Sequence, residues 1–377
     1  MNLKIPFERV NWLNTAFLGV ICLTALIASP IYLWNHGING FQLGMLLFYI
    51  IATGMSITLG YHRLFSHLSF RAKWPIRLAT LVFGACALEN SALNWVSDHR
   101  RHHKHTDHDD DPYDISKGFF WAHMGWILFK LNPIPPLDNV ADLRKDALVM
   151  WQHRWDKVIA LVVGLLLPAG LGYLWNATHG LDPWTGALGG FLLAGVLRVF
   201  LVQQCTFFIN SLCHTIGEQP YSTRCSARDS FVMSLVTFGE GYHNYHHEFQ
   251  HDYRNGVKPW NFDPTKWAIW LLAKVGLASD LRRVPESKVV LAEMMEARRH
   301  ADAELARLKS LGEHHPWRDK AIESANALVE RLTNSYNELE AAMVGRVDLS
   351  RKALRRWTQE TREVLDRLAE ISKPLPA

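Results

Sequence analysis

The chain has 377 residues, of which 49% are hydrophobic and 20% charged, with a formal net charge of +4. So small a charge, scattered along the chain, excludes the basic surface that nucleic-acid binding needs, whereas mild basicity suits a protein beside anionic lipid headgroups. The five cysteines form no Cys-x-x-Cys pair, which argues against a disulfide framework or a thiolate metal cluster.

Four apolar segments are long enough to cross a bilayer core of ~30 Å, which takes ~20 helical residues. They cover residues 12–34, 40–61, 158–176 and 186–212. The first is longer than the apolar part of a signal peptide and has no small-residue cleavage site, so we expect a retained anchor. The first three contain no Asp, Glu, Lys or Arg, and the fourth carries only Arg198. A fifth apolar run, 74–95, contains Arg77 and Glu89 and predicts one helix that packs on the others or lies partly in the interface.

Positive charge marks one side of the predicted bundle. The connections 35–39 and 177–185 lack Lys and Arg, whereas the opposite ends carry several, among them Arg9, Arg63, Lys145 and Arg154. The positive-inside rule makes that side cytoplasmic. We therefore expect both termini, a cap formed by 62–157 and 213–284, and all histidine clusters to lie on the cytoplasmic face.

Three histidine clusters stand beside these segments: His62-Arg-Leu-Phe-Ser-His67, His99-Arg-Arg-His-His103 and His243-Asn-Tyr-His-His247. In the second and third clusters the imidazoles recur at i, i+3 and i+4, which places them on one side of a helix. His62 and His67, five residues apart, suit the frayed end of a span. Neutral imidazole is a common ligand of iron, zinc, copper and nickel. Eight imidazoles are too many for one tetrahedral zinc site and suit two metal ions with open coordination positions.

Several acidic residues lie close in sequence to the second histidine cluster: Asp98, Asp107 and 109–111. Their carboxylates could orient imidazole N–H groups, or they could form a solvated loop. Zinc hydrolysis usually needs a carboxylate base near a polar substrate, for which the sequence has no signature. An imidazole-rich dimetal site at the end of an apolar bundle instead favours oxygen chemistry on a lipid.

Residues 285–377 form a charged extension. Apolar residues alternate by three and four from Ile322 to Met343 and again from Leu354 to Ile371, with a break at 314–316. This heptad-like pattern predicts a helical hairpin that packs on itself or on the catalytic body. A dimerising coiled coil, and hence a homo-oligomer, or a docking surface for a redox partner are the alternatives.

The three clusters, in this order and between these apolar segments, resemble the membrane fatty acid desaturases, specifically their acyl-CoA Δ9 (stearoyl-CoA-type) branch. The resemblance runs from about residue 40 to 284 and includes Asn94-Trp-Val-Ser-Asp-His99, Asn210-Ser-Leu-Cys-His214 and Gly239-Glu-Gly-Tyr-His243. It implies an all-α integral membrane protein with four transmembrane helices and a cytosolic helical cap. We expect a desaturase domain over 1–284 and a helical extension over 285–377.

The resemblance also implies the site residues. It makes His214 a ninth histidine ligand, and it makes Asn210 a ligand through water. Trp95 and Thr206 match positions that shape a bent acyl tunnel, and Asn90 matches one at its entrance. Phe207 stands where the family often has Trp, and it has no indole N–H. The implied metal ligands are His62, His67, His99, His102, His103, His214, His243, His246 and His247, with no further catalytic side chain.

The implied reaction inserts a cis double bond into a saturated acyl-CoA, or an acyl lipid, with two iron ions and O2. Electrons would come from a separate ferredoxin-like or cytochrome b5-like donor and its reductase. Two alternatives remain open: a lipid hydroxylase on the same scaffold, and a membrane protein that handles metal ions without catalysis. The second predicts charged residues along the spans, and the first three spans have none.

Overall fold

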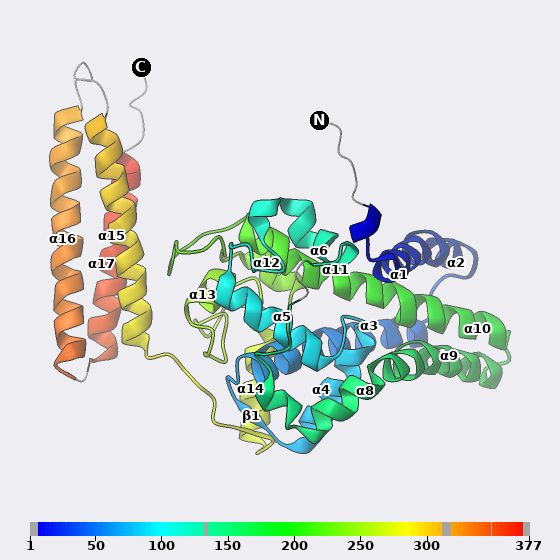
Figure 1. Ribbon diagram of the computed structural model, residues 1–377. Helices are drawn as coiled ribbons and strands as arrows, with labels where there is room; N and C mark the ends of the chain where they lie inside the picture. The colour runs from blue at the N-terminus through cyan, green and yellow to red at the C-terminus, as the bar shows by residue number, and fades with distance from the viewer. Residues whose placement is uncertain (1–6, 132–134, 311–317, 348, 372–377) are drawn as a thin grey trace. The chain divides into compact units, whose positions relative to one another are not determined.

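The computed structural model describes residues 7–131, 135–310, 318–347 and 349–371. Within these ranges the chain forms two compact units. The first comprises the described residues of 7–217 and 226–282, and the second comprises those of 218–225 and 283–371. The first unit contains four helices that are long and apolar enough to cross a membrane (Figure 1). The prediction of an all-α protein with four membrane spans is confirmed.

Each span is a continuous helical rod containing a stretch of π-helix. The spans cover Trp12–His36, Gly40–Ser66, Ala147–Thr178 and Pro183–His214, so they start earlier or end later than the apolar segments alone predicted. The extra turns add polar residues at the ends of the apolar stretches that the sequence shows. The component helices are α1 (Trp12–Leu23), α2 (Ser29–His36), α3 (Gly40–Met55), α8 (Ala147–Leu161), α9 (Leu167–Thr178), α10 (Pro183–Gly189) and α11 (Arg198–Ser211).

The π-helix Ser56–Ser66 ends the second span and is buried at every residue. It carries His62, which therefore lies on a buried helix. This corrects the expectation, drawn from the spacing of His62 and His67, that the two lie at a frayed helix end. His67 follows at the helix C-cap, where its backbone N–H donates to the carbonyl of His62 at 3.1 Å. The wider π-helical turn thus lets both imidazoles project into the same space.

The apolar run 74–95 forms two helices, which corrects the expectation of a single one. Helix α4 (Trp74–Cys86) ends in a turn, and α5 (Ala92–His105) starts after the N-cap Ser91. Leu88 and Asn90 have positive φ, which is costly for residues other than glycine. Arg198 and Gln203 of α11 hold this turn, because their side chains donate to the carbonyls of Cys86 and of residues 87 and 88.

Arg198, the one charged residue of the fourth apolar segment, is fully buried inside the bundle. Its guanidinium also donates to the carbonyl of Gly164 at 2.7 Å. Cys86, whose carbonyl also accepts from Arg198, is the last residue of α4, and the partial negative charge of a helix C-terminus compensates a cation beside it. The remaining elements of this unit are the short helices Phe7–Arg9, Ile115–Lys117, Trp121–Gly125, α6 (Trp126–Leu128), α7 (Ala141–Arg144), α12 (Phe231–Val236), α13 (His243–Glu248) and α14 (Pro264–Lys274).

The described part of this unit contains one small sheet. Strands β1 (Arg71–Ala72) and β2 (Ala278–Ser279) pair antiparallel, with Arg71 opposite Ser279 and Ala72 opposite Ala278. Just beyond it, the backbone N–H of Lys73 donates to the carbonyl of Leu277 at 2.9 Å. The sheet therefore joins the end of α14 to the start of α4.

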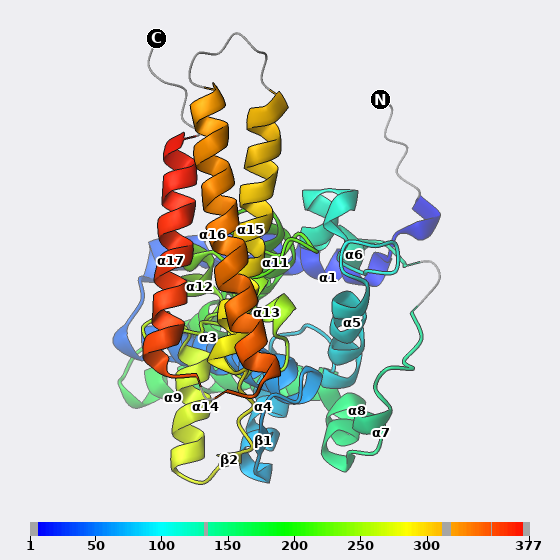
Figure 2. The same ribbon diagram turned by 90° about the vertical axis from the view of Figure 1, so that its left-hand side faces the viewer.

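The second unit has three helices, α15 (Glu286–Ser310), α16 (Arg318–Val344) and α17 (Arg351–Ile371), which run side by side (Figure 2). The predicted hairpin of two helices is therefore wrong, because this unit has three helices in the described residues. The predicted apolar stripes of α16 and α17 do face inward, and they pack with a third stripe on α15 that includes Met294, Ala301 and Leu308. The predicted break at 314–316 lies outside the described residues.

Candidate metal centre

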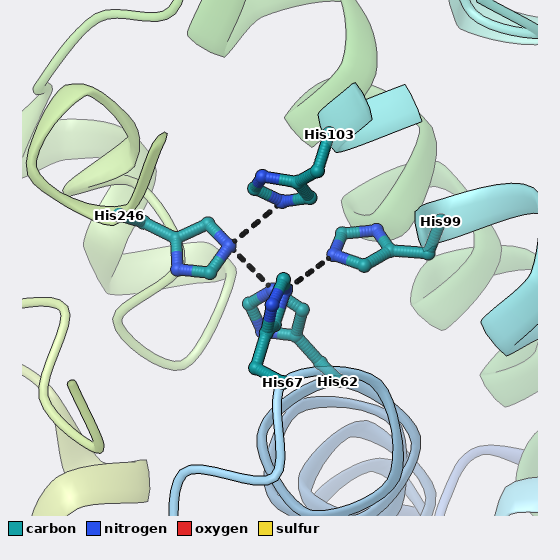
Figure 3. Close-up of side chains that lie close together, drawn as sticks. All are labelled: His62, His67, His99, His103 and His246. Atoms are coloured by element: carbon teal, nitrogen blue, oxygen red, sulfur yellow. Dashed lines mark hydrogen bonds between the residues drawn. The ribbon is translucent and has the colours of Figure 1, made fainter. Parts of the chain in front are cut away.

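Nine histidines from four segments of the chain converge in two groups. The first group holds His62, His67, His99, His103 and His246, and the second holds His102, His214, His243 and His247. Within each group one nitrogen of every imidazole lies within 4.8 Å of the others. Figure 3 shows the five rings of the first group directed toward a common point. The structure thus brings together every histidine that was predicted to bind metal.

Adjacent histidines go to different groups. His102 belongs to the second group and His103 to the first, while His246 belongs to the first and His247 to the second. Successive residues of a helix point about 100° apart, so one turn of α5 and one turn of α13 can serve two neighbouring positions. The two groups therefore share two supporting helices, as expected for two metal ions held close together.

The imidazole nitrogens face one another at hydrogen-bonding distance. Nε2 of His67 lies 2.8 Å from Nε2 of His99, and Nε2 of His246 lies 2.9 Å from that of His62. In the second group Nε2 of His243 lies 3.1 Å from that of His214. Two neutral imidazoles that both keep their proton on Nδ1 would present lone pairs to each other, which a cation between them would satisfy.

Three imidazoles have partners that hold the proton on Nδ1. Asp111 lies 2.9 Å from Nδ1 of His102, and Glu240 lies 2.8 Å from Nδ1 of His62. Ser226 lies 2.7 Å from Nδ1 of His214, and its hydroxyl and backbone N–H donate to Asp107. A partner of this kind fixes the ring and leaves Nε2 free to bind a metal. The donor set therefore fits a pair of transition-metal ions.

Electrostatics favour neutral rings in both groups. Burial, followed by repulsion from neighbouring imidazoles, lowers the pKa of six group members outside the membrane spans well below the ordinary value for histidine: His67, His99, His103, His243, His246 and His247. Neutral imidazole is the form that binds metals. For Glu240, burial acts in the opposite direction, but His62 and Arg63 lower its pKa and keep it ionised.

Of the acidic residues expected to orient imidazole N–H groups, Asp111 does so directly and Asp107 does so through Ser226. Asp110 lies only 3.9 Å from His105, which belongs to neither group. Asp98 lines a cavity, where burial raises its pKa to about 7. The sequence analysis did not identify Ser226 or Glu240. The nearest signal for Glu240 was its place three residues before His243, and Ser226 had no signal of its own.

A cavity of about 500 Å³ ends at the histidines. His62, His99 and His243 line it, together with apolar side chains of α1, α6 and α11. The volume is that of a typical small-molecule site, ~300–1,000 Å³. The cavity also contains all the predicted substrate-contacting residues and the predicted water-mediated ligand: Asn90, Trp95, Thr206, Phe207 and Asn210.

One partly buried carboxyl group joins two walls of this cavity. Glu89 accepts hydrogen bonds from Nε1 of Trp95 at 3.3 Å and from the hydroxyl of Thr206 at 2.9 Å. The indole of Trp95 in turn stacks on His99, with ring centroids 4.9 Å apart. Glu89 was predicted only as a charge in an apolar run. The structure makes it the link between the two residues that the resemblance assigned to the bend.

Comparison with known proteins agrees with this arrangement. A family model described as "Fatty acid desaturase" matches residues 41–275. The chain is 38% identical to acyl-CoA desaturase 1 of Saccharomyces cerevisiae over 309 residues, which cover 80% of this chain and 57% of the yeast protein. It is 38% identical to a probable acyl-CoA desaturase of Schizosaccharomyces pombe over 291 residues, which cover 75% of this chain and again 57% of that protein.

A vertebrate relative is covered more fully. The chain is 32% identical to stearoyl-CoA desaturase of Capra hircus over 322 residues, which cover 82% of this chain and 80% of the goat protein. The family match spans more than half of the chain and covers the second, third and fourth spans together with all nine histidines. This chain, a multi-pass membrane protein, therefore belongs to the fatty acid desaturase family.

Proposed function

We propose that the protein is an O2-dependent fatty acyl desaturase that inserts a cis double bond, at Δ9, into a saturated acyl-CoA. The observation that carries this proposal is the position of the nine imidazoles at the end of the cavity that Trp95 and Thr206 line. The names of the relatives support the reaction and the acyl-CoA substrate class.

The overall reaction balances with two external electrons. A –CH2–CH2– unit, O2, two electrons and two protons give a –CH=CH– unit and two water molecules. Two iron ions held by the two histidine groups would supply the redox chemistry for O2 and the C–H bonds. The ligand assignments, including Asn210 through water, are part of the proposal, as is the separate ferredoxin-like or cytochrome b5-like electron donor with its reductase.

The side chains of the protein would position the acyl chain. Apolar residues such as Phe17, Leu18 and Ile57 line the cavity and would exclude water from the chain. Trp95, held between Glu89 and His99, would fix where the chain bends relative to the histidines. Positioning of this kind selects one C–C bond for reaction. Regioselectivity would therefore depend on the rigidity of the Trp95–Glu89–Thr206 contact.

Orientation and domain roles complete the proposal. The distribution of Lys and Arg supports a cytoplasmic position for the termini and the histidine groups. Residues 1–284 would form the catalytic domain and residues 285–377 a separate helical extension. A homo-oligomer formed through the helices of this extension is the alternative to a bundle that packs only on itself.

The test is gas chromatography of fatty acids from cells that express the chain. We expect a new cis-9 monoene, and we expect it to disappear in His103→Ala. His105→Ala is the matched control, because His105 lies on the same helix but in neither group. A hydroxylated product would instead assign the protein to hydroxylases. An unchanged lipid profile from folded, iron-loaded protein supplied with reductant would contradict an acyl-modifying role.

A further inference from the structure

Two helices that do not span the membrane expose apolar side chains. On α12, Phe231, Val232, Leu235 and Val236 are between 46% and 68% exposed, while Ser234 and Thr237 are buried. Its polar side chains are buried and its apolar side chains are exposed, which is the reverse of a helix that faces water. A surface of this kind marks a site of contact with lipid or with another protein.

Helix α14 also exposes an apolar stripe, although its inner side is partly apolar too, because Ile269 is fully buried in the core. Trp267, Trp270, Leu271 and Val275 form an exposed stripe at i, i+3, i+4 and i+8, while Thr265 and Lys266 are buried. Polar hydrogen bonds hold the inner side, since the ammonium group of Lys266 donates to two backbone carbonyls at 2.6 Å. The stripe is therefore left exposed by the described part of this unit, apart from a ring contact between Trp267 and Phe262, whose centroids lie 5.8 Å apart.

The two helices continue the apolar surface of the second span. Exposed apolar side chains of that span include Leu47, Phe48 and Ile51, and from residue 53 it is covered. Phe238, just after α12, packs so closely on Gly54 that a Cβ there would lie 2.4 Å from its ring. Thr265 of α14 hydrogen-bonds to the hydroxyl of Thr58 at 2.8 Å and donates to the carbonyl of Phe238 at 2.9 Å.

The composition of the exposed residues distinguishes between lipid and protein as the contact. The exposed Trp74 starts α4 directly after the exposed Lys73, and the small sheet joins this point to the end of α14. There the ammonium group of the exposed Lys274 lies 5.4 Å from the ring centroid of Trp270. Tryptophan with lysine or arginine next to aliphatic side chains is the pattern of the membrane–water interface. In Figure 1, α12 and α14 lie on the side of the membrane helices away from the turn between α9 and α10.

We infer that α12 and α14 lie in the plane of the bilayer, with their exposed stripes inserted at the boundary between headgroups and acyl chains. The inference rests on the membrane assignment and not on the proposed reaction. Insertion of α12 would also position the histidines. The backbone N–H of Ser230, at the start of α12, donates to the carbonyl of Gly241 at 2.7 Å. Gly241 is two residues before His243, so the inserted helix holds the third histidine cluster at a fixed height above the lipid.

The test is spin labelling of the full chain in nanodiscs of phosphatidylcholine and phosphatidylglycerol. Native cysteines are replaced by alanine, and labels are placed by Val232→Cys and Leu271→Cys. Leu47→Cys, exposed within the second span, is the lipid reference, and Lys104→Cys, exposed on α5, is the water reference. Relaxation by O2, which concentrates among acyl chains, is compared with relaxation by a water-soluble nickel chelate.

We expect both test labels to respond mainly to O2, as Leu47→Cys does, and to be shielded from the chelate. Strong relaxation by the chelate, as at Lys104→Cys, would overturn the inference because the stripes would then face water. Weak relaxation by both reagents would overturn it equally, since a protein surface would then cover them. Because no arm measures activity, failure here is distinguishable from failure of the desaturase proposal.

Discussion

Nδ1 of His62 lies 2.8 Å from Oε2 of Glu240, and this contact ties the second span to the third histidine cluster. Glu240 also accepts from the guanidinium of Arg63 at 2.9 Å, and Asp263 accepts from the same guanidinium at 3.0 Å. The carboxylate thus orients a member of the first histidine group while remaining charge-compensated in a buried position.

Replacing Glu240 by glutamine should weaken metal binding. The amide keeps the size of the side chain but loses the charge that holds the proton on Nδ1 of His62. Loss of such an outer partner typically costs about 10–100-fold in metal affinity. Iron retained per chain after dialysis against a graded chelator measures the effect. Asp280→Asn, which removes an exposed carboxylate paired with Arg71, should retain the parental affinity. Equal iron retention in Glu240→Gln and the parent would contradict the positioning role.

Asp111→Asn should act on the second histidine group. Asp111 lies 2.9 Å from His102 and accepts backbone N–H bonds from Tyr113 and Asp107. These contacts lower its pKa although burial opposes them, so it is ionised at neutral pH. We expect about one of two bound metal ions to become easily removable, whereas Asp109→Asn, on an exposed residue of the same loop, should leave both in place. Simultaneous loss of both ions would show that the groups do not bind independently.

The metal-free protein should lose stability in mild acid. Burial lowers the pKa of His67, His99 and His103 in the folded chain, whereas histidine in the unfolded chain titrates near 6.5. Below that pH the unfolded state takes up protons that the folded state cannot, so the free energy of unfolding falls as the pH falls. Above it the contribution is fully present. Thermal unfolding of chelator-treated protein should show this decline, and iron-loaded protein should show it only at lower pH. Parallel curves for the two forms would contradict the assignment.

Glu89 should produce the opposite dependence. Burial raises its pKa from 4.5 to about 8, so the folded state keeps a proton that the unfolded state loses. Its contribution to stability is present below pH 4.5 and is lost as the pH rises to about 8, a difference on the order of 5 kcal/mol at ~1.4 kcal/mol per pKa unit. Glu89→Gln removes the titration, so its Tm relative to the parent should rise across this window. A constant difference in Tm would show that Glu89 is ionised in the folded protein.

The spans and the histidine clusters were predictable because each rests on a local pattern. Apolar length defines a span, and the i, i+3, i+4 spacing defines a face of α5 or α13. The assignment of His102 and His103 to different groups was not predictable, because it depends on which distant imidazoles meet each ring. The break between α4 and α5 depends on Arg198 and Gln203, more than a hundred residues away, which hold a turn that the apolar sequence itself does not signal.

Gly172→Ala should destabilise the hairpin formed by α9 and α10. A Cβ at Gly172 would lie 2.1 Å from the carbonyl oxygen of Gly186, and a Cβ at Gly186 would lie 2.3 Å from that of Gly172. Small residues permit this approach of backbones within a membrane, where close packing replaces the hydrophobic effect between helices. Separation of the helices should cost about 1–3 kcal/mol, as over-packing does in protein cores.

Gly170→Ala is the matched control, because it adds the same methyl group two residues away on the same helix, where a Cβ would meet nothing within 4 Å. Both variants gain the same helix propensity from the loss of glycine, so any difference in Tm between them reports the contact with Gly186 alone. We expect the Tm of Gly172→Ala to fall below that of Gly170→Ala in the same detergent. Equal Tm values would mean that the third and fourth spans do not meet at these glycines, and the close approach of the two backbones would then have to be abandoned.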